Sequence, residues 1–389
     1  MTTLAKMSPP IFLVLLLTAS CGATVGVDTP ASERVDASEA FTIEEQATFD
    51  EPWAADFLPG TDVLVVTEKA GTIRGYDTTS GESFAISGAP KVDYGGQGGL
   101  GDVAFLQSEA SDTIGSRTIY LSWAEAGEGD ARGAAVGKGQ LVCTASRDCA
   151  VEGLTVIWRQ RPKVTGRGHY SHRLLLSPDE RYLFVSSGDR QKLTPAQDTS
   201  NTLGTIVRLN LDGTPAAGNP FAERGSPSDE IWSFGHRNVL GLDWDAEGRL
   251  WNLEHGPRGG DELNLVDPGA NYGWPVVSNG VHYNGSGIPD HETRPDLAAP
   301  AISWNPVIAP GDLHFYRGGL FPGWRGDALI PGLSVQSLVR VEIEGESARE
   351  AARYGFDSRI REVVEGPDGA LWLLEDGKGA HLLRLTPKP

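Results

Sequence analysis

One short unit recurs along this chain of 389 residues. It consists of an apolar strand, a turn of two to four residues containing Pro, Asp or Gly, and a second strand ending near an acid. Six copies begin at Ala55, Asp102, Leu174, Leu242, Gly319 and Val363. The first and last turns, near Gly60 and Gly369, define five intervals of about 62 residues. No unit is large enough to bury its own apolar face, so the units must pack against one another. The repeat therefore predicts an all-β fold, a six-bladed β-propeller with antiparallel four-stranded blades over residues 45–389. A β-sandwich would need fewer strands and less regular spacing.

The N-terminus has the pattern of an export signal. Lys6 is the only charge before Cys21, and an apolar run follows from Ile11 to Leu17. Seven apolar residues are too few to span a bilayer, which favours a cleaved signal peptide at 1–20 over a membrane anchor. The segment resembles a bacterial lipoprotein signal, in which Cys21 would carry the lipid, although Leu17 lies four residues before the cysteine instead of three. Ordinary signal cleavage, giving a secreted protein, remains the alternative. Residues 21–44 are small and polar and are predicted to be a flexible tether.

The remaining cysteines and the net charge agree with an exported protein. Cys143 and Cys149 enclose five residues, and we expect them to form a disulfide in an oxidising periplasm. The formal net charge of −19 argues against binding to nucleic acid or to anionic lipid in general. In such an acidic chain a local cluster of arginines is a stronger indication of an anion-binding site than it would be in a basic chain.

The segment from His255 to Pro275 has an unusual composition, rich in Gly and Pro and poor in apolar residues. Glycine and proline specify an unusual backbone path, and Asp261 and Glu262 are hard oxygen ligands of the kind calcium prefers. The segment is therefore expected to be a metal-binding loop. Residues 271–310 are expected to form a longer loop over one end of the propeller.

Two further segments contain chemically active side chains. Gly96, Gly98 and Gly101 match a dinucleotide-binding spacing, but a strand pattern follows instead of a helix, so the match is rejected. His169 lies at the mouth of a strand, and Asp189 follows the paired strand, so antiparallel pairing can bring the two together. A carboxylate beside an imidazole is the arrangement of a general base, although a histidine at a strand end is often structural.

Basic and amide side chains recur near strand starts. Arg237 and Asn238 precede one strand, and Arg359 and Arg361, spaced by two, point to one side of another. Any single arginine could be an ordinary surface residue. Arginines at the same place in several blades would converge on the central funnel and bind a planar polyanion.

These motifs, in this order from Phe49 to Pro387, resemble the soluble quinoprotein sugar dehydrogenases, in particular the periplasmic aldose sugar dehydrogenases that use pyrroloquinoline quinone (PQQ). The resemblance rests on GGQGG, H-x-x-x-R-L, GD, the block from Ala196, GHRN, HGPRGGDELNL with NYGWP, and R-x-R. It implies oxidation of the anomeric hydroxyl of an aldose to a lactone, with PQQ and calcium as cofactors and a quinone or redox protein as electron acceptor.

The resemblance also implies a role for each site residue. His169 would be the catalytic base, and Asp189 would orient it. The cofactor would contact Gln97, Arg237, Asn238, Arg359 and Arg361. The carbonyls of Gly256 and Pro257 would hold a catalytic calcium, while Glu262 and the carbonyl of Tyr272 would hold a structural one.

The sequence departs from the family pattern at two positions. Ser334 stands at about the place of a lysine that family members commonly direct at the quinone, with no lysine nearby in the sequence, and His172 replaces the usual Ser or Gly. The missing lysine leaves a second hypothesis, a non-catalytic propeller that binds a sugar or a protein. A third, a calcium-dependent hydrolase, would need several side-chain carboxylates and Asn on one ion.

Overall fold

The computed structural model of the protein describes Met1 and residues 32–389. These residues form twenty-six β-strands, one short α-helix, α1 (Ala37–Ala40), and five 3-10 turns. The turns are η1 (Gln107–Glu109), η2 (Thr194–Gln197), η3 (Ala222–Arg224), η4 (Ser228–Glu230) and η5 (His291–Thr293). The fold is therefore all-β, as the sequence predicts. The predicted signal peptide and Cys21 lie outside the described residues, except for Met1.

The strands form five sheets. In sheet order the largest contains β3 (Pro52–Phe57), β4 (Val63–Glu68), β5 (Thr72–Asp77), β6 (Glu82–Ser87), β10 (Cys149–Arg159), β9 (Ala131–Cys143), β8 (Ser116–Ala126) and β7 (Leu100–Phe105), with β11 (Val164–Thr165) paired to β9. The second sheet contains β12 (Ser171–Leu176), β13 (Tyr182–Ser187), β14 (Thr205–Asn210) and β15 (Ile231–Phe234). The third contains β16 (Val239–Trp244), β17 (Leu250–Glu254), β18 (Asp261–Leu265) and β19 (Ile302–Trp304). The fourth contains β1 (Arg34–Asp36), β23 (Ser347–Gly355), β22 (Ser337–Glu344), β21 (Ala328–Gly332) and β20 (His314–Phe315). The fifth contains β2 (Phe41–Phe49), β26 (Ala380–Pro387), β25 (Leu371–Glu375) and β24 (Ile360–Glu365).

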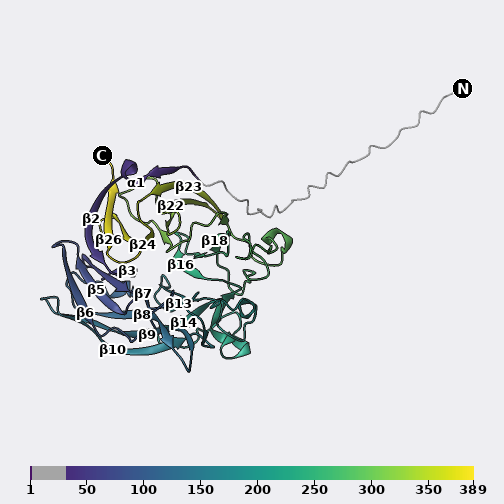
Figure 1. The fold of residues 1–389 in the computed structure, drawn as a ribbon, viewed down its shortest axis with the longest axis horizontal. Coiled ribbons are helices and arrows are strands. Elements are labelled where there is room, and N and C mark those ends of the chain that lie inside the picture. Colours follow the sequence, from purple (N-terminus) through teal and green to yellow (C-terminus); the bar gives the residue numbers. More distant parts are fainter. Residues whose placement is uncertain (2–31) are drawn as a thin grey trace.

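The sheets follow one another around a ring (Figure 1). The largest sheet consists of two antiparallel groups, β3–β6 and β7–β10, joined by a short parallel pairing of β6 with β10. The ring closes where β2, near the start of the described chain, pairs antiparallel with β26 at its end. Strand pairing between the two ends of the chain holds the ring together.

The hydrophobic core lies between neighbouring groups of strands. Six clusters of buried apolar side chains each join two successive groups around the ring. In one of them Val65 and Ile73 of the first group pack with Leu121 of the second. Each group of strands is thus covered by apolar side chains of its neighbours, and strands such as β4 (VLVVTE) and β25 (LWLLE) are apolar along most of their length.

The innermost strands carry charged residues at matching positions. Asp56 on β3, Asp102 on β7 and Asp243 on β16 each accept a backbone N–H from the inner strand of the next group, donated by Phe105, Leu174 and Phe315. These bonds run around the ring axis and connect the inner strands of neighbouring groups, which do not pair with each other in a sheet. These acids within the inner strands therefore help to hold the groups of strands together.

The predicted tether is wrong for residues 34–44. β1 pairs with β23, and β2 pairs with β26 from Phe41 onward. The physical reason is burial, because Ala37 and Phe41 are 1% and 2% exposed and lie in an apolar cluster with Phe321. Because the segment is mostly polar, its composition did not indicate that these two apolar side chains would be buried.

Two other expectations concern covalent structure and the membrane. A disulfide joins Cys143 at the end of β9 to Cys149 at the start of β10, as expected. Within residues 32–389 no helix is long and apolar enough to cross a bilayer.

Candidate active site

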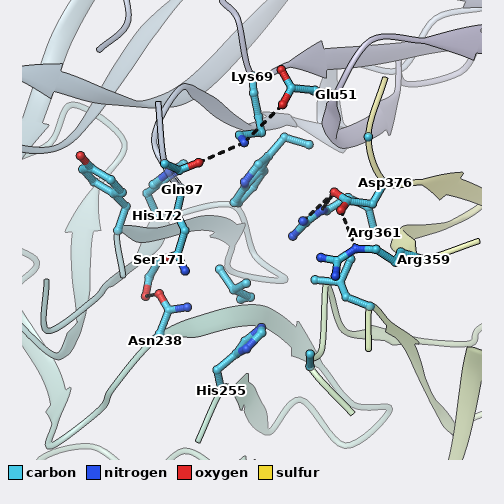
Figure 2. A pocket seen from close by; sticks show the side chains of 17 residues that line it. Glu51, Lys69, Gln97, Ser171, His172, Asn238, His255, Arg359, Arg361 and Asp376 are labelled. Carbon is cyan, nitrogen blue, oxygen red and sulfur yellow. Dashed lines mark hydrogen bonds and ion pairs between the residues drawn. The ribbon is translucent and has the colours of Figure 1, made fainter. Parts of the chain in front are cut away.

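Two adjoining cavities open where the inner strands begin, and His255 lines both. The larger has a volume of about 310 Å³ and the smaller about 10 Å³. Figure 2 shows side chains from several groups of strands pointing into the larger cavity. Those with polar or aromatic character are Glu51, Trp53, Lys69, Gln97, Tyr170, Ser171, His172, Asn238, His255, Arg359, Arg361 and Asp376. The sequence prediction of a site at one end of the ring axis is consistent with this placement.

His169 and Asp189 form a buried pair beside the cavities. Ser171 on β12 pairs with Ser187 on β13, and this register brings the residues that flank the hairpin together. His169 Nδ1 lies 2.7 Å from Asp189 Oδ1, and the two residues are 6% and 0% exposed. The predicted pairing is therefore what the structure shows.

The proton positions in this pair follow from its surroundings. Burial alone would raise the pKa of Asp189, but its hydrogen bonds with His169, the Trp274 indole and the Gln191 amide bring that pKa below its usual value. Burial lowers the pKa of His169, an effect that Asp189 partly offsets and the charge of Arg237 reinforces. His169 is thus neutral near pH 7, with its proton on Nδ1 facing the carboxylate. Its Nε2 keeps a free lone pair, as a general base requires.

The backbone around this pair is strained. His169, Ser171 and His172 have φ values of 48°, 57° and 59°, a left-handed region that non-glycine residues rarely occupy. Arg190 and Gln191, which follow Asp189, have φ values of 53° and 61°. Such strain is typical of sites where the surrounding structure forces a side chain into a working position.

Arg359 and Arg361 share one carboxylate at the rim of the larger cavity. Arg359 Nε lies 2.8 Å from Asp376 Oδ2, and an Arg361 terminal nitrogen lies 2.7 Å from Oδ1. Burial would raise the pKa of Asp376, but the charges and hydrogen bonds of the two arginines hold it below its usual value. Two guanidinium groups against one carboxylate leave a net positive charge for an anionic ligand.

Two amide side chains line the same cavity with donor groups free. Gln97 accepts the backbone N–H of His169 through Oε1 at 2.6 Å, and Asn238 accepts the Ser171 hydroxyl through Oδ1 at 3.3 Å. Among the described residues neither side-chain NH2 group has a partner. The structure thus brings four of the five predicted cofactor contacts together in one cavity.

The fifth, Arg237, lines the smaller cavity instead. Its terminal nitrogens donate to the His255 carbonyl at 3.1 Å and the Tyr283 hydroxyl at 3.2 Å, and its buried Nε has no partner in the described part of the chain. A buried donor without a partner indicates room for a ligand oxygen at this position.

The predicted calcium ligands are only partly grouped as expected. Gly256, Glu262 and Tyr272 line the same small cavity, whose volume suits one ion or one water, while Pro257 is buried nearby and does not line it. Glu262 lies 3.2 Å from His291, and its charge helps to raise the pKa of that imidazole despite burial. Hard oxygens around a cavity of this size fit a calcium ion. In residues 32–389 no three His, Cys, Asp or Glu side chains are grouped as metal ligands, so any ion here relies on carbonyl oxygens as well.

Asp261 is not available as a metal ligand. Residues 261–265 form β18 and not a loop, because Leu263 is buried in the apolar core. The Asp261 carboxylate accepts the backbone N–H groups of Gly256 at 2.9 Å and Ala309 at 2.7 Å, and burial raises its pKa to about 7. Its role is to hold the turn that carries Gly256, where a Cβ would come within 2.2 Å of the Gly260 carbonyl oxygen.

One wall of the larger cavity is a stack of side chains that sequence analysis did not assign. The His172 ring stacks on Trp53 with centroids 4.9 Å apart, and the Arg173 guanidinium lies 4.3 Å from the Trp53 ring. Gly101 permits this, because a Cβ there would meet the His172 ring at 1.9 Å. Burial lowers the pKa of His172 to about 3, so it is a neutral wall residue and not a second base.

Comparison of the whole chain with known proteins identifies its family. The sequence pattern of glucose/sorbosone dehydrogenases matches residues 49–384. The chain belongs to this family. The matched range includes both residues of the buried histidine–carboxylate pair, His169 and Asp189.

Individual relatives of the same family are similar over nearly their whole length. The aldose sugar dehydrogenase YliI of Escherichia coli K12 is 35% identical over 350 residues, covering 88% of this chain and 92% of that protein. The crystal structure of the soluble aldose sugar dehydrogenase of E. coli in its apo form superposes with a TM-score of 0.82 at 33% identity, covering 90% of this chain and all of that one. The PQQ-bound aldose sugar dehydrogenase of Streptomyces coelicolor superposes with a TM-score of 0.69 at 26% identity, covering 92% and 100%.

Asp376, Trp274 and Lys69 are site residues to which sequence analysis assigned no role. Asp376 could have been predicted from the repeat, because the second strand of each hairpin unit ends near an acid. Three of these acids, Asp189, Glu254 and Asp376, lie at the site. Trp274 belongs to the NYGWP motif, which predicted no role for its side chain. Lys69 had no signal, because its place at the cavity depends on how the groups of strands pack.

Proposed function

We propose that this protein is a PQQ- and calcium-dependent aldose dehydrogenase that oxidises the anomeric hydroxyl of a sugar to a lactone. The observation that carries the proposal is the buried His169–Asp189 pair, with its free Nε2, next to a cavity lined by two arginines and two amides. Membership of the family and the PQQ-bound relative support it.

The residues present fit the two cofactors. PQQ carries three carboxylates, and the larger cavity offers Arg359, Arg361, Gln97 and Asn238 as donors. The carbonyls of Gly256 and Pro257 would hold the calcium next to PQQ, and Glu262 and the Tyr272 carbonyl would hold a second, structural calcium; Gly256, Glu262 and Tyr272 line the adjoining small cavity. When bound, PQQ supplies the two-electron acceptor, and calcium supplies polarisation of its quinone oxygen.

The protein's own residues account for the proton. His169 Nε2 takes the proton of the anomeric hydroxyl, while its Nδ1–H remains bonded to Asp189, which stabilises the imidazolium that forms. Trp274 and the amides of Gln191 and Leu193 hold Asp189 in place. The anomeric carbon loses two electrons as hydride and becomes the lactone carbonyl carbon. A quinone or redox protein would then reoxidise the enzyme.

The architecture we propose is a six-bladed propeller. Supporting it are six successive antiparallel groups, β3–β6, β7–β10, β12–β15, β16–β19, β20–β23 and β24–β26 with β2, and the six apolar clusters between them. The strands β3, β7, β12, β16, β20 and β24 are innermost in this arrangement. We further propose a periplasmic location with a lipid anchor on Cys21. Cys21→Ser should release the protein from the membrane fraction, and unchanged membrane association would contradict the anchor.

The test of the activity is reconstitution. Purified apoprotein is loaded with PQQ and calcium, and dye reduction is followed with glucose and other aldoses. His169→Ala should abolish turnover and leave PQQ uptake, followed by the quinone spectrum, largely intact. The control is His381→Ala, since His381 also pairs with a carboxylate, Glu375 at 2.8 Å, but outside both cavities. PQQ uptake without turnover of any sugar would favour the non-catalytic sugar-binding or protein-binding alternative.

A further inference from the structure

Lys69 lines the larger cavity although nothing in the sequence connects it with the site. It follows β4 directly, at the start of the turn to β5. Figure 2 shows it pointing into the cavity from the side of Glu51 and Gln97, while Arg359 and Arg361 approach from the side of Asp376. Cations therefore enter this cavity from two different groups of strands.

The backbone of Lys69 is firmly held. Its N–H donates to the Glu51 carbonyl at 3.0 Å, and its own carbonyl accepts the Leu100 N–H at 3.0 Å. A Cβ at Gly99 would come within 2.2 Å of that carbonyl oxygen, so the glycine is needed for the close approach. Gly99 of the GGQGGLG segment thus allows the close approach that holds the Lys69 backbone.

The ammonium group, in contrast, is only lightly engaged. Nζ lies 3.2 Å from the Gly96 carbonyl oxygen and 3.8 Å from Glu51 Oε1, which is beyond hydrogen-bond distance. The Tyr94 ring centroid is 5.9 Å away. A lysine has three N–H donors, and in the described part of the chain only the Gly96 carbonyl accepts one at hydrogen-bond distance. Two donors remain for a ligand, and the side chain is 18% exposed.

The arginines of the site each have protein partners of their own. Arg359 and Arg361 share Asp376, and Arg237 is bonded to His255 and Tyr283. At Ser334, where the family's lysine was expected, the side chain is exposed, donates to the Val307 carbonyl at 3.2 Å and does not line the cavity. A flat ligand with carboxylates on several edges needs cations on more than one side.

We propose that Lys69 binds a carboxylate of PQQ and so supplies, from a different strand group, the positive charge that Ser334 does not. The inference rests on the proposed function. Lys69 is a point charge on a flexible stem, so it can follow a carboxylate that the fixed arginines do not reach.

The experiment is a titration of purified apoprotein with PQQ in the presence of calcium, followed by quinone absorbance and by quenching of tryptophan fluorescence. Lys69→Gln should raise the dissociation constant about tenfold or more, because it removes a charge-assisted hydrogen bond. Lys69→Arg should restore part of the affinity. The matched control is Lys138→Gln, which removes the same charge from β9, where Lys138 lies over the Tyr120 ring outside the cavity.

The trimethyl ester of PQQ separates binding from a structural role. The ester carries no carboxylate charge, so the Lys69→Gln penalty should disappear with it. An equal penalty for PQQ and its ester, or unchanged PQQ affinity in Lys69→Gln, would overturn the inference while leaving the proposed function standing. If the unmodified protein takes up no PQQ at all, the proposed function fails and the inference fails with it.

Discussion

Arg173 on β12 and Glu362 on β24 form a two-point ion pair across the ring axis, with nitrogen–oxygen distances of 3.0 and 2.5 Å. The two residues are 189 positions apart in the chain and almost fully buried. Arg173 also approaches Asp102 at 3.5 Å and Asp312 at 3.6 Å. Arg173 packs on Trp53, which lines the 310 Å³ cavity, and itself lines a separate cavity of about 420 Å³ further along the inner strands, which we call the second cavity of the ring.

Removing this arginine should destabilise the protein strongly. Arg173→Gln leaves Glu362, Asp312 and Asp102 buried without a counter-charge, and we expect the free energy of unfolding to fall by about 3–5 kcal/mol. Chemical denaturation followed by tryptophan fluorescence measures the change. The control is Arg294→Gln, whose exposed pair with Asp296 should contribute little. Equal effects of the two substitutions would show that the buried network does not hold the ring together.

The acids around the second cavity should make stability depend on pH. Burial, with the nearby charge of Asp102, raises the pKa of Asp56 to about 8. A carboxyl whose pKa is higher in the folded state binds a proton more tightly there, so its contribution to stability is lost as pH rises from about 4 to about 8. Asp56→Asn cannot ionise. It should come closest to the unmodified protein at pH 4, and its advantage in free energy of unfolding should grow by about 1 kcal/mol or more between pH 5 and pH 8. A difference that shrinks with rising pH would show that Asp56 is stabilised as the anion.

Asp189 should control the pH profile of the reaction. Its hydrogen bond and charge raise the pKa of His169 against the larger effect of burial. In Asp189→Asn that support is lost, so the acidic limb of kcat/KM should move to lower pH. The plateau should also fall about tenfold or more, because the imidazolium is no longer stabilised. Glu365→Gln is the matched control, since Glu365 lies 3.3 Å from His314 at the second cavity. A limb that stays in place would mean that His169 is not the titrating base.

The two rim arginines should contribute unequally to PQQ binding. The Arg361 side chain is 12% exposed and that of Arg359 51% exposed, so solvent screens the second charge more. Arg361→Gln should therefore raise the PQQ dissociation constant more than Arg359→Gln, and added salt should reduce the effect of Arg359 more. Titration of the two apoprotein variants at low and high salt provides the comparison. The reverse order would place the cofactor's carboxylate outside the rim.

The disulfide should affect stability without affecting catalysis. Cys143 and Cys149 close a small loop between β9 and β10, outside both active-site cavities. Replacing both by Ser should lower the free energy of unfolding by about 2 kcal/mol, as loop closure of this length implies. Turnover by the folded variant should be unchanged. A loss of turnover without loss of stability would indicate that the conformation of this edge of the sheet affects the geometry of the site.

Much of the site was accessible from sequence because its residues belong to local patterns. His169 and Asp189 flank one hairpin, so strand pairing alone brings them together. Arg359 and Arg361 share a side of one strand, and the cysteine pair lies within one turn. Local composition misled in two places. Asp261 looked like a loop ligand but belongs to β18, and residues 34–44 looked like a tether but hold the buried anchors Ala37 and Phe41.

The sequence by itself determined that the fold is all-β, because repeated strand–turn–strand units that cannot bury their own faces must pack against one another. It also predicted that His169 and Asp189 meet, because the two residues flank one hairpin. Only the tertiary structure decided what meets between different groups of strands, namely the Arg173–Glu362 pair across the ring axis and Lys69 in the same cavity as Arg359 and Arg361. The physical reason is that contacts between different groups of strands depend on their packing angle and register around the ring, which no local spacing in the chain records.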